Sequence, residues 1–240
     1  MTPLITCLCL TTSPGRLHLL PDALRSYRQQ TYRPRELLVV NDGSPLSSRA
    51  PDVRVVNLPE RGSPWTIGEK RNVGIRAANG DYLATWDDDD VSLPHRLQQQ
   101  MHALSSWGSV CVVVDQMFVS DKNLRLLGLC SRGWLKAVMA SALVSRNAMV
   151  SAGGYSVTNY MEDAEMLERI RYLHRGRVAT IRDARFYVLR RHDTNVTLLA
   201  GETADEYAQC ALRNPSVNSA QYAVDAVHSG PGGDDVIASA

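Results

Sequence analysis

The chain has 240 residues, of which 44% are hydrophobic and 21% are charged, and its formal net charge is +1. This composition is ordinary for a globular protein, and the length is sufficient for one sizeable hydrophobic core. The nearly neutral charge excludes a global electrostatic field that would select a polyanionic or a cationic partner. No uninterrupted apolar stretch approaches the length of about 18 residues that a membrane span needs.

The five cysteines and the start of the chain bear on its compartment. No two cysteines form a C-x-x-C pair, and their number is odd, so the sequence predicts neither a zinc framework nor a disulfide scaffold. The chain starts Met1-Thr2-Pro3, without the basic start and apolar run of a secretory signal. We therefore expect a reducing compartment and a cytoplasmic protein.

The first half of the chain alternates between short apolar runs and helical patterns. We expect strands at residues 4–10, 36–40, 53–58 and 81–86. We expect helices at residues 17–30, at residues 66–78, and after Pro94. Continuous apolar strands with helical crossovers predict an α/β fold, in which helices cover both faces of a Rossmann-like, mostly parallel central sheet.

The pattern is less regular after residue 108. We expect strands at residues 110–114, 124–129, 137–144, 178–181 and 185–189, and helices at residues 146–151 and 162–174. From residue 214 onward Ser, Ala, Gly and Asp dominate, and the run SGPGG disfavours regular structure. We expect one domain over residues 1–213, divided near residue 108, and a mobile tail over residues 214–240.

Four adjacent aspartates, Asp87 to Asp90, follow the strand expected at residues 81–86. Two unit charges about 5 Å apart repel by roughly 3 kcal/mol at an effective dielectric of about 20, and by less than about 1 kcal/mol in water. A turn exposed to water therefore tolerates such a run. Alternatively, hard carboxylate oxygens at one strand end suit Mg²⁺ or Mn²⁺ carrying a phosphate. The four residues by themselves leave both interpretations open.

Polar residues follow three of the expected strands. Thr12 follows the first, Asp42 the second, and the acidic run Asp87 to Asp90 the fourth. In open parallel sheets, ligands bind beyond the carboxyl ends of the strands. The convergence of these residues at one edge favours a binding site over a solvated turn.

Four ordered segments resemble the GT-A glycosyltransferases of family 2, which use nucleotide-diphosphate sugars. RLHLLPDALRSYRQQTYRPRELLVVNDGS is similar to the family's opening, and GEKRNVGIRAANGDYLATWDDDDVSLPHRL to the block with Arg-Asn-x-Gly, a DxD-type motif and Pro-x-Arg-Leu. SAGGYSVTNYMEDAEMLERI resembles the Gly-Gly-Phe/Tyr and Glu-Asp block, and RRHDTNVT the closing Arg-x-His segment. The resemblance covers residues 3–197 and implies a GT-A fold with a nucleotide-binding half (about 1–108) and an acceptor-side half (109–213).

The resemblance implies roles in donor binding. Thr12 would contact the nucleotide base, Asp42 would accept a hydrogen bond from it, and Arg71 would lie near the base or the diphosphate. A turn aspartate that bonds its own loop and an exposed helix arginine remain the alternatives for the last two. Asp87 and Asp88 would face the ribose.

The resemblance also implies a divalent metal, Mn²⁺ or Mg²⁺. Asp89 would hold this ion, and His192 of the closing motif would be a further ligand or a phosphate contact. The chain departs from the family pattern because its four aspartates run without a gap. The assignment among Asp87, Asp88 and Asp89 therefore stays open by one position.

Asp163 matches the position of the family's general base, which would deprotonate the acceptor hydroxyl in an inverting displacement. An aspartate in a first helical turn is also favoured by the helix dipole alone. The expected donor is a nucleotide-diphosphate sugar, with UDP as the family's commonest nucleotide. A nucleotidyltransferase and an inactive sugar-nucleotide-binding module are the alternatives, although residues 11–16 are a poor phosphate loop, and the presence of both Asp89 and Asp163 argues against an inactive module.

The acceptor is not predicted. A saccharide, a lipid-linked glycan, a phosphate-bearing polymer and a nucleic acid all remain possible. Residues 169–191 contain eight arginines, and Asp183 is the single acidic residue in this range. They would suit phosphates on the acceptor, although codon bias toward G and C gives the same richness in arginine without a functional meaning.

Overall fold

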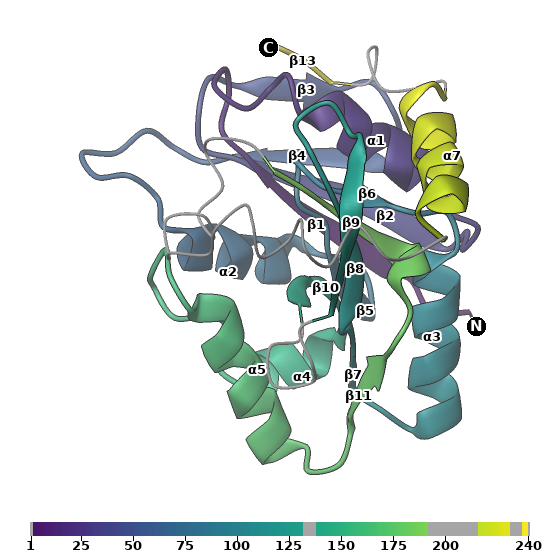
Figure 1. The fold of residues 1–240 in the computed structure, drawn as a ribbon. Helices are drawn as coiled ribbons and strands as arrows, with labels where there is room; N and C mark the ends of the chain where they lie inside the picture. The colour runs from purple at the N-terminus through teal and green to yellow at the C-terminus, as the bar shows by residue number, and fades with distance from the viewer. Residues whose placement is uncertain (1, 132–137, 192–215, 231–236, 240) are drawn as a thin grey trace.

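The structure is a computed structural model, and it describes residues 2–131, 138–191, 216–230 and 237–239. A seven-stranded sheet forms its centre, in the order β11-β7-β10-β5-β1-β2-β4 (Figure 1). Its strands are β1 (Ile5–Thr11), β2 (Arg35–Asn41), β4 (Val53–Asn57), β5 (Tyr82–Thr85), β7 (Cys111–Val114), β10 (Val138–Ser145) and β11 (Val178–Ile181). β10 is antiparallel to β5 and β7, and the other pairs are parallel. The predicted α/β class with a mostly parallel sheet is confirmed.

Helices cover both faces of this sheet (Figure 1). Cys7 and Cys9 of β1 pack on the side of α1 (Leu20–Arg28) and α3 (Arg96–Trp107). Leu8 packs on the side of α2 (Ile67–Ala77), α4 (Arg146–Ser151) and α5 (Glu162–Leu173). Because successive side chains of a strand point to opposite faces, a strand buried on both faces needs a continuous apolar run, which β1 has. Within the described part of the chain, no helix is both long and apolar enough to cross a membrane.

A second sheet adjoins the acidic run. Its order is β6-β12-β8-β9, with β6 (Val91–Ser92), β12 (Tyr187–Arg190), β8 (Gln116–Ser120) and β9 (Leu126–Ser131). β6 begins directly after Asp90, so the run lies between β5 of the first sheet and β6 of the second. β6 and β8 are not among the expected strands. The strand expected at residues 185–189 begins only at Tyr187, because Asp183 caps a short 3-10 turn, η2 (Ala184–Phe186), in front of it.

Within residues 214–240, which we expected to be a mobile tail, the structure describes a helix and a short strand, and the mobility of this segment stays a prediction. A helix, α7 (Ser216–His228), packs against α1, and β13 (Ile237–Ser239) pairs with β3 (Leu46–Ser48). Val224 and Val227 are completely buried, and their spacing with Ala220 follows a helical period. The small-residue composition of the segment obscured this apolar stripe. The division of residues 1–213 into two halves stays a prediction.

Asp22 of α1 connects the tail helix with the second sheet. Its carboxylate accepts hydrogen bonds from Arg190 Nη2 at 2.5 Å and Arg25 Nη1 at 3.0 Å, and lies 2.8 Å from His228 Nδ1. Although burial favours the neutral form, the ionic partners Arg190 and His228 lower the pKa of Asp22. α1, β12 and α7 are therefore joined by one charged group.

Candidate active site

The carboxyl ends of three parallel strands bring the candidate residues together. Strand β1 pairs with β2 up to Thr11 and Asn41, and with β5 at Leu8 and Thr85. Thr12, Asp42 and the acidic run therefore leave neighbouring strands at the same edge, as expected for a ligand site. The loops after β1 and β2 also touch, because a Cβ on Gly43 would lie 1.8 Å from the carbonyl oxygen of Ser13. Only glycine allows this approach.

Asp42 is the centre of a small ionic group. Thr12 Oγ1 donates a hydrogen bond to Asp42 Oδ1 at 2.6 Å, and Lys70 Nζ donates to the same oxygen at 3.1 Å. Lys70 is 8% exposed, and a buried ammonium requires such a partner. Because the group includes a buried lysine from α2, Asp42 is more than a turn residue that bonds its own loop. The sequence analysis missed Lys70, although it directly precedes Arg71.

Arg16 binds two members of the acidic run. Its Nε lies 3.1 Å and 3.0 Å from the two carboxylate oxygens of Asp88. Its Nη2 lies 2.5 Å from Asp88 Oδ1 and 2.6 Å from Asp89 Oδ2. Asp88 is 2% exposed, so the forked guanidinium group of Arg16 supplies the positive charge that a buried carboxylate needs. Arg16 is a second residue that the sequence analysis did not single out.

Asp90 belongs to the framework of the site. It accepts hydrogen bonds from the hydroxyl of Tyr187 and, at 2.8 Å, from the backbone N–H of Arg190. Burial raises the pKa of Asp90 well above its ordinary value. Asp90 therefore fixes the end of the acidic run to β12.

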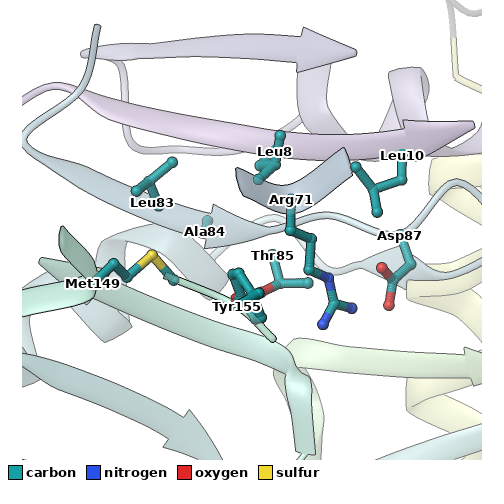
Figure 2. Close-up of a pocket in the computed structure, with 9 residues that line it drawn as sticks. All are labelled: Leu8, Leu10, Arg71, Leu83, Ala84, Thr85, Asp87, Met149 and Tyr155. Atoms are coloured by element: carbon teal, nitrogen blue, oxygen red, sulfur yellow. The ribbon is translucent and has the colours of Figure 1, made fainter. Parts of the chain in front are cut away.

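Asp87 lies beside Arg71 in a small pocket. Figure 2 shows the Arg71 guanidinium between the ring of Tyr155 and the carboxylate of Asp87. The guanidinium carbon is 5.1 Å from the ring centre, and Nη1 donates to Glu162 Oε1 at 2.8 Å. Desolvation and the neighbouring carboxylates raise the pKa of Asp87 to about 7, although the Arg71 charge opposes the shift. Arg71 is 9% exposed, which excludes the alternative of an exposed helix arginine.

Arg71 also links the acidic run to the expected base. Asp163 follows Glu162 in the first turn of α5, is partly buried, and accepts a hydrogen bond from its own helix at Ala164 N, 2.7 Å away. Burial favours loss of the Arg71 proton, yet the acidic groups around it, which include Asp87, Glu162 and Asp163, raise its pKa above the ordinary value. One buried cation thus lies within electrostatic reach of both groups of carboxylates.

The loop before α5 places Glu162 and Asp163 against α2. Asn159 Oδ1 accepts a hydrogen bond from Ile67 N at 2.8 Å, and the Thr158 carbonyl accepts one from Gly68 N at 3.1 Å. A Cβ on Gly68 would lie 1.8 Å from the Ser156 carbonyl oxygen. The loop therefore satisfies the free N–H groups at the start of α2, and it holds α5 close to Arg71.

Of the two residues expected to hold a metal ion, the structure describes only Asp89. His192 lies outside the described residues. Among the residues that the structure describes, no three His, Cys, Asp or Glu side chains gather into a metal cage. Mg²⁺ and similar ions are nevertheless often held by one or two carboxylates, with phosphate and water oxygens completing the shell. The hard oxygen donors of Asp88 and Asp89 at the sheet edge fit an ion of this kind.

Three arginines of the arginine-rich stretch are paired with carboxylates of the chain itself. Arg171 pairs with Glu168 at 2.6 Å, and Arg185 pairs with Asp183 at 2.6 Å. Arg190 is buried against Asp22. The sequence could not reveal this pairing, because it depends on which acids the folded chain brings near.

The solved structures that share this fold include the following two. The structure of TarS 1-349 from S. aureus in complex with UDP-GlcNAc superposes with a TM-score of 0.57 at 14% identity, over 94% of this chain and 72% of that chain. The mannosyltransferase PcManGT from Pyrobaculum calidifontis, in complex with GDP-Man and Mn²⁺, superposes with a TM-score of 0.56 at 14% identity, over 97% of this chain and 77% of that chain. The fold is that of the GT-A glycosyltransferases.

The sequence relationship identifies the family. The family described as Glycosyl transferase family 2 matches residues 14–137, just over half of the chain. The chain therefore belongs to glycosyltransferase family 2. It is 32% identical over 115 residues to the uncharacterized glycosyltransferase YwdF of Bacillus subtilis (strain 168), covering 45% of this chain and 42% of YwdF. It is 28% identical over 123 residues to the succinoglycan biosynthesis protein ExoO of Rhizobium meliloti (strain 1021), covering 48% of this chain and 34% of ExoO. Each match spans less than half of the relative's length.

Proposed function

We propose that the protein transfers a sugar, with inversion at the anomeric carbon, from a UDP-sugar to an acceptor hydroxyl in a metal-dependent reaction. One observation carries this proposal. The Asp42 group, the acidic run and the pair Glu162-Asp163 lie around the carboxyl edge of one sheet, with the buried Arg71 between the last two. In open parallel sheets, nucleotides bind at an edge of this kind, beyond the carboxyl ends of the strands.

In this proposal the donor binds along the sheet edge. Thr12 and Asp42 contact the uracil, with Asp42 accepting from the base N–H, and Asp87 and Asp88 face the ribose. Arg71 stabilises the negative charge of the diphosphate. Support comes from the solved neighbours, since TarS has been determined with UDP and UDP-GlcNAc. PcManGT, determined with GDP-Man, shows that the same fold also accepts another nucleotide.

Asp89 would hold Mn²⁺ or Mg²⁺, with His192 as a further ligand. When bound, the ion supplies a Lewis acid that offsets the charge gathering on the departing nucleoside diphosphate. PcManGT, which has the same fold, was determined with Mn²⁺. Asp88 remains the alternative ligand, because both carboxylates meet the same arginine fork.

Asp163 would act as the general base. The carboxylate takes the proton of the acceptor hydroxyl while the hydroxyl oxygen forms a bond to the anomeric carbon. The bond from that carbon to the diphosphate oxygen breaks in the same displacement, and the electron pair leaves with the nucleoside diphosphate. Attack from the face opposite the leaving group gives inversion. A carboxylate in this role typically contributes about 10²–10⁴-fold to the rate.

We propose a saccharide hydroxyl, free or lipid-linked, as the acceptor. A phosphate-bearing polymer or a nucleic acid would require a group of available cations. Among the described residues of the arginine-rich stretch, Arg171, Arg185 and Arg190 are engaged with carboxylates of the protein itself. This pairing favours an acceptor that is recognised through hydroxyl groups.

Two measurements test the proposed function. Thermal unfolding with UDP, GDP, CDP and ADP, each with and without Mn²⁺, should show the largest stabilisation with UDP and Mn²⁺, and EDTA should remove the metal-dependent part. Incubation with UDP-sugars and acceptor saccharides should then release UDP, with the product anomer opposite to that of the donor by NMR. Failure of every nucleoside diphosphate to stabilise the protein would refute the proposal.

A nucleotidyltransferase is the alternative that the geometry disfavours. Such an enzyme needs a loop with open N–H groups and a cation that faces a triphosphate. The loop after β1, residues 11–16, has a single glycine, Gly15, and Pro14 has no N–H to offer, so it is a poor phosphate loop. Release of pyrophosphate from a nucleoside triphosphate and a sugar phosphate would nevertheless establish that activity.

A further inference from the structure

Arg16 occupies the carboxylate oxygens that the proposed reaction needs. It lies in the loop between β1 and α1, where its backbone N–H donates to the Thr12 carbonyl at 2.8 Å. Its Nη2 is shared between Asp88 Oδ1 at 2.5 Å and Asp89 Oδ2 at 2.6 Å, while its Nε bonds Asp88 alone. The hydrogen bond from Nη2 to Asp89 can therefore be released while Nε stays bound to Asp88.

The charges of the acidic run explain why a counter-ion is present. The side chain of Asp88 is 3% exposed and that of Asp89 is 13% exposed, so water screens their mutual repulsion poorly. The side chain of Arg16 is 28% exposed, which gives its guanidinium access to the open side of the site. An arginine fork also matches phosphate oxygens as well as carboxylate oxygens.

We propose that Arg16 is an exchangeable counter-ion that keeps divalent cations off Asp89 until the nucleotide diphosphate binds. This inference rests on the proposed function, because it takes Asp89 as the metal ligand. In the absence of donor, Arg16 neutralises Asp88 and Asp89. When the diphosphate arrives, Arg16 releases Asp89 Oδ2 and donates to the phosphate oxygens, while it keeps its Nε bond to Asp88.

The exchange has a thermodynamic consequence. If the diphosphate removes Arg16 from Asp89, then nucleotide strengthens the binding of the cation, and the cation strengthens the binding of nucleotide by the same factor. Coupling of this kind is typically about 5–150-fold. A protein without Arg16 should bind the cation alone more tightly, and it should lose a large part of the coupling.

The experiment measures the affinity for Mn²⁺ by electron paramagnetic resonance of the free ion, with and without UDP. Arg16→Gln should bind Mn²⁺ alone about tenfold more tightly than the wild type. The factor by which UDP strengthens Mn²⁺ binding should fall by a similar amount. Arg16→Lys, which keeps the charge but loses the fork, should fall between the two, and circular dichroism should show that both variants are folded.

Two matched variants separate the exchange from a general loss of positive charge. Lys70→Gln removes a cation of the same site that is bound to Asp42, and Arg28→Gln removes an arginine of similar exposure, 31%, that pairs with Asp52. Both should leave the affinity for Mn²⁺ alone close to that of the wild type.

The outcomes distinguish a failure of the role of Arg16 from a failure of the proposed function. An Arg16→Gln variant that binds Mn²⁺ no more tightly than the wild type, or no more tightly than Lys70→Gln, overturns the role of Arg16 while the proposed function stands. If the wild type binds neither UDP nor Mn²⁺ in the presence of UDP, the proposed function itself fails, and the inference fails with it.

Discussion

Replacement of the expected base provides the sharpest test of the proposed chemistry. The change Asp163→Asn keeps the shape of the side chain and an oxygen that can accept the hydrogen bond from Ala164 N at 2.7 Å. It removes the negative charge and the ability to take a proton. The fold should therefore survive, and the loss should appear in the chemical step.

The expected loss of stability and the expected loss of turnover differ in size. The stability cost is that of one negative charge in the first turn of a helix, about 0.3–1 kcal/mol. The kinetic cost is the loss of general-base catalysis, about 10²–10⁴-fold, which corresponds to about 2.7–5.4 kcal/mol of the activation barrier. Turnover should fall by this factor, while the affinity for UDP in the presence of Mn²⁺ stays within about twofold of the wild type, since the group expected to hold the base consists of Thr12, Asp42 and Lys70.

The assay follows UDP release under saturating donor, with UDP affinity measured by calorimetry. Glu165→Gln is the matched control, because Glu165 lies in the same helical turn and its side chain is 54% exposed. It should retain nearly full turnover. Turnover of Asp163→Asn within about twofold of the wild type would refute the assignment, and so would a loss of UDP affinity as large as the loss of turnover.

Three further changes test the framework of the site. Lys70→Met should weaken UDP binding by about tenfold in calorimetry, because it takes the ammonium from Asp42 and leaves that carboxylate without its cation; unchanged affinity would contradict this role. Gly43→Ala should lower the midpoint of thermal unfolding and abolish UDP binding, since its Cβ would lie 1.8 Å from a carbonyl oxygen, whereas Gly62→Ala, in open space, should be neutral. Asp22→Asn should lower the free energy of unfolding by about 2 kcal/mol at pH 7. Because ionic partners lower the pKa of Asp22 in the folded state, its contribution is complete above the unfolded pKa of about 4 and is lost as the pH falls through the folded pKa. The difference from the wild type in urea unfolding should therefore shrink at pH 3, and an equal difference at both pH values would disprove the linkage.

Arg71 gives the site a physical connection between its two sides. Its guanidinium is bonded to Glu162, while the charge of Asp87 acts on it from the other side. A bound diphosphate would add negative charge near the same cation. One buried cation is thus shared between the acidic run and the start of α5.

The sequence predicted the fold because its strongest signals are local. The buried strands β1 and β2 are continuous apolar runs, and the helices between them repeat apolar residues with a helical period. A parallel topology then places all strand ends at one edge, so that Thr12, Asp42 and the acidic run could be expected to meet. The roles of these residues in catalysis stay predictions.

The tail helix shows how a local signal can be lost. The spacing of Ala220, Val224 and Val227 is helical, yet the surrounding small and polar residues suggested a mobile segment. What makes α7 a stable element is the apolar surface that it meets, together with the contact of 2.8 Å between His228 Nδ1 and Asp22 Oδ1. A short helix seldom forms without such packing.

The sequence alone determined the order of the central strands and of the helices that cover them, the family, and the edge of the sheet where the polar residues gather, because periodicity and motif order are properties of neighbouring residues. Only the tertiary structure decided how the charges of that edge are paired. Arg16 with Asp88, Lys70 with Asp42 and Arg71 with Glu162 join residues that are 72, 28 and 91 positions apart. The pairing of a buried charge depends on which opposite charge the folded chain brings within a few ångströms, and no local pattern carries that information.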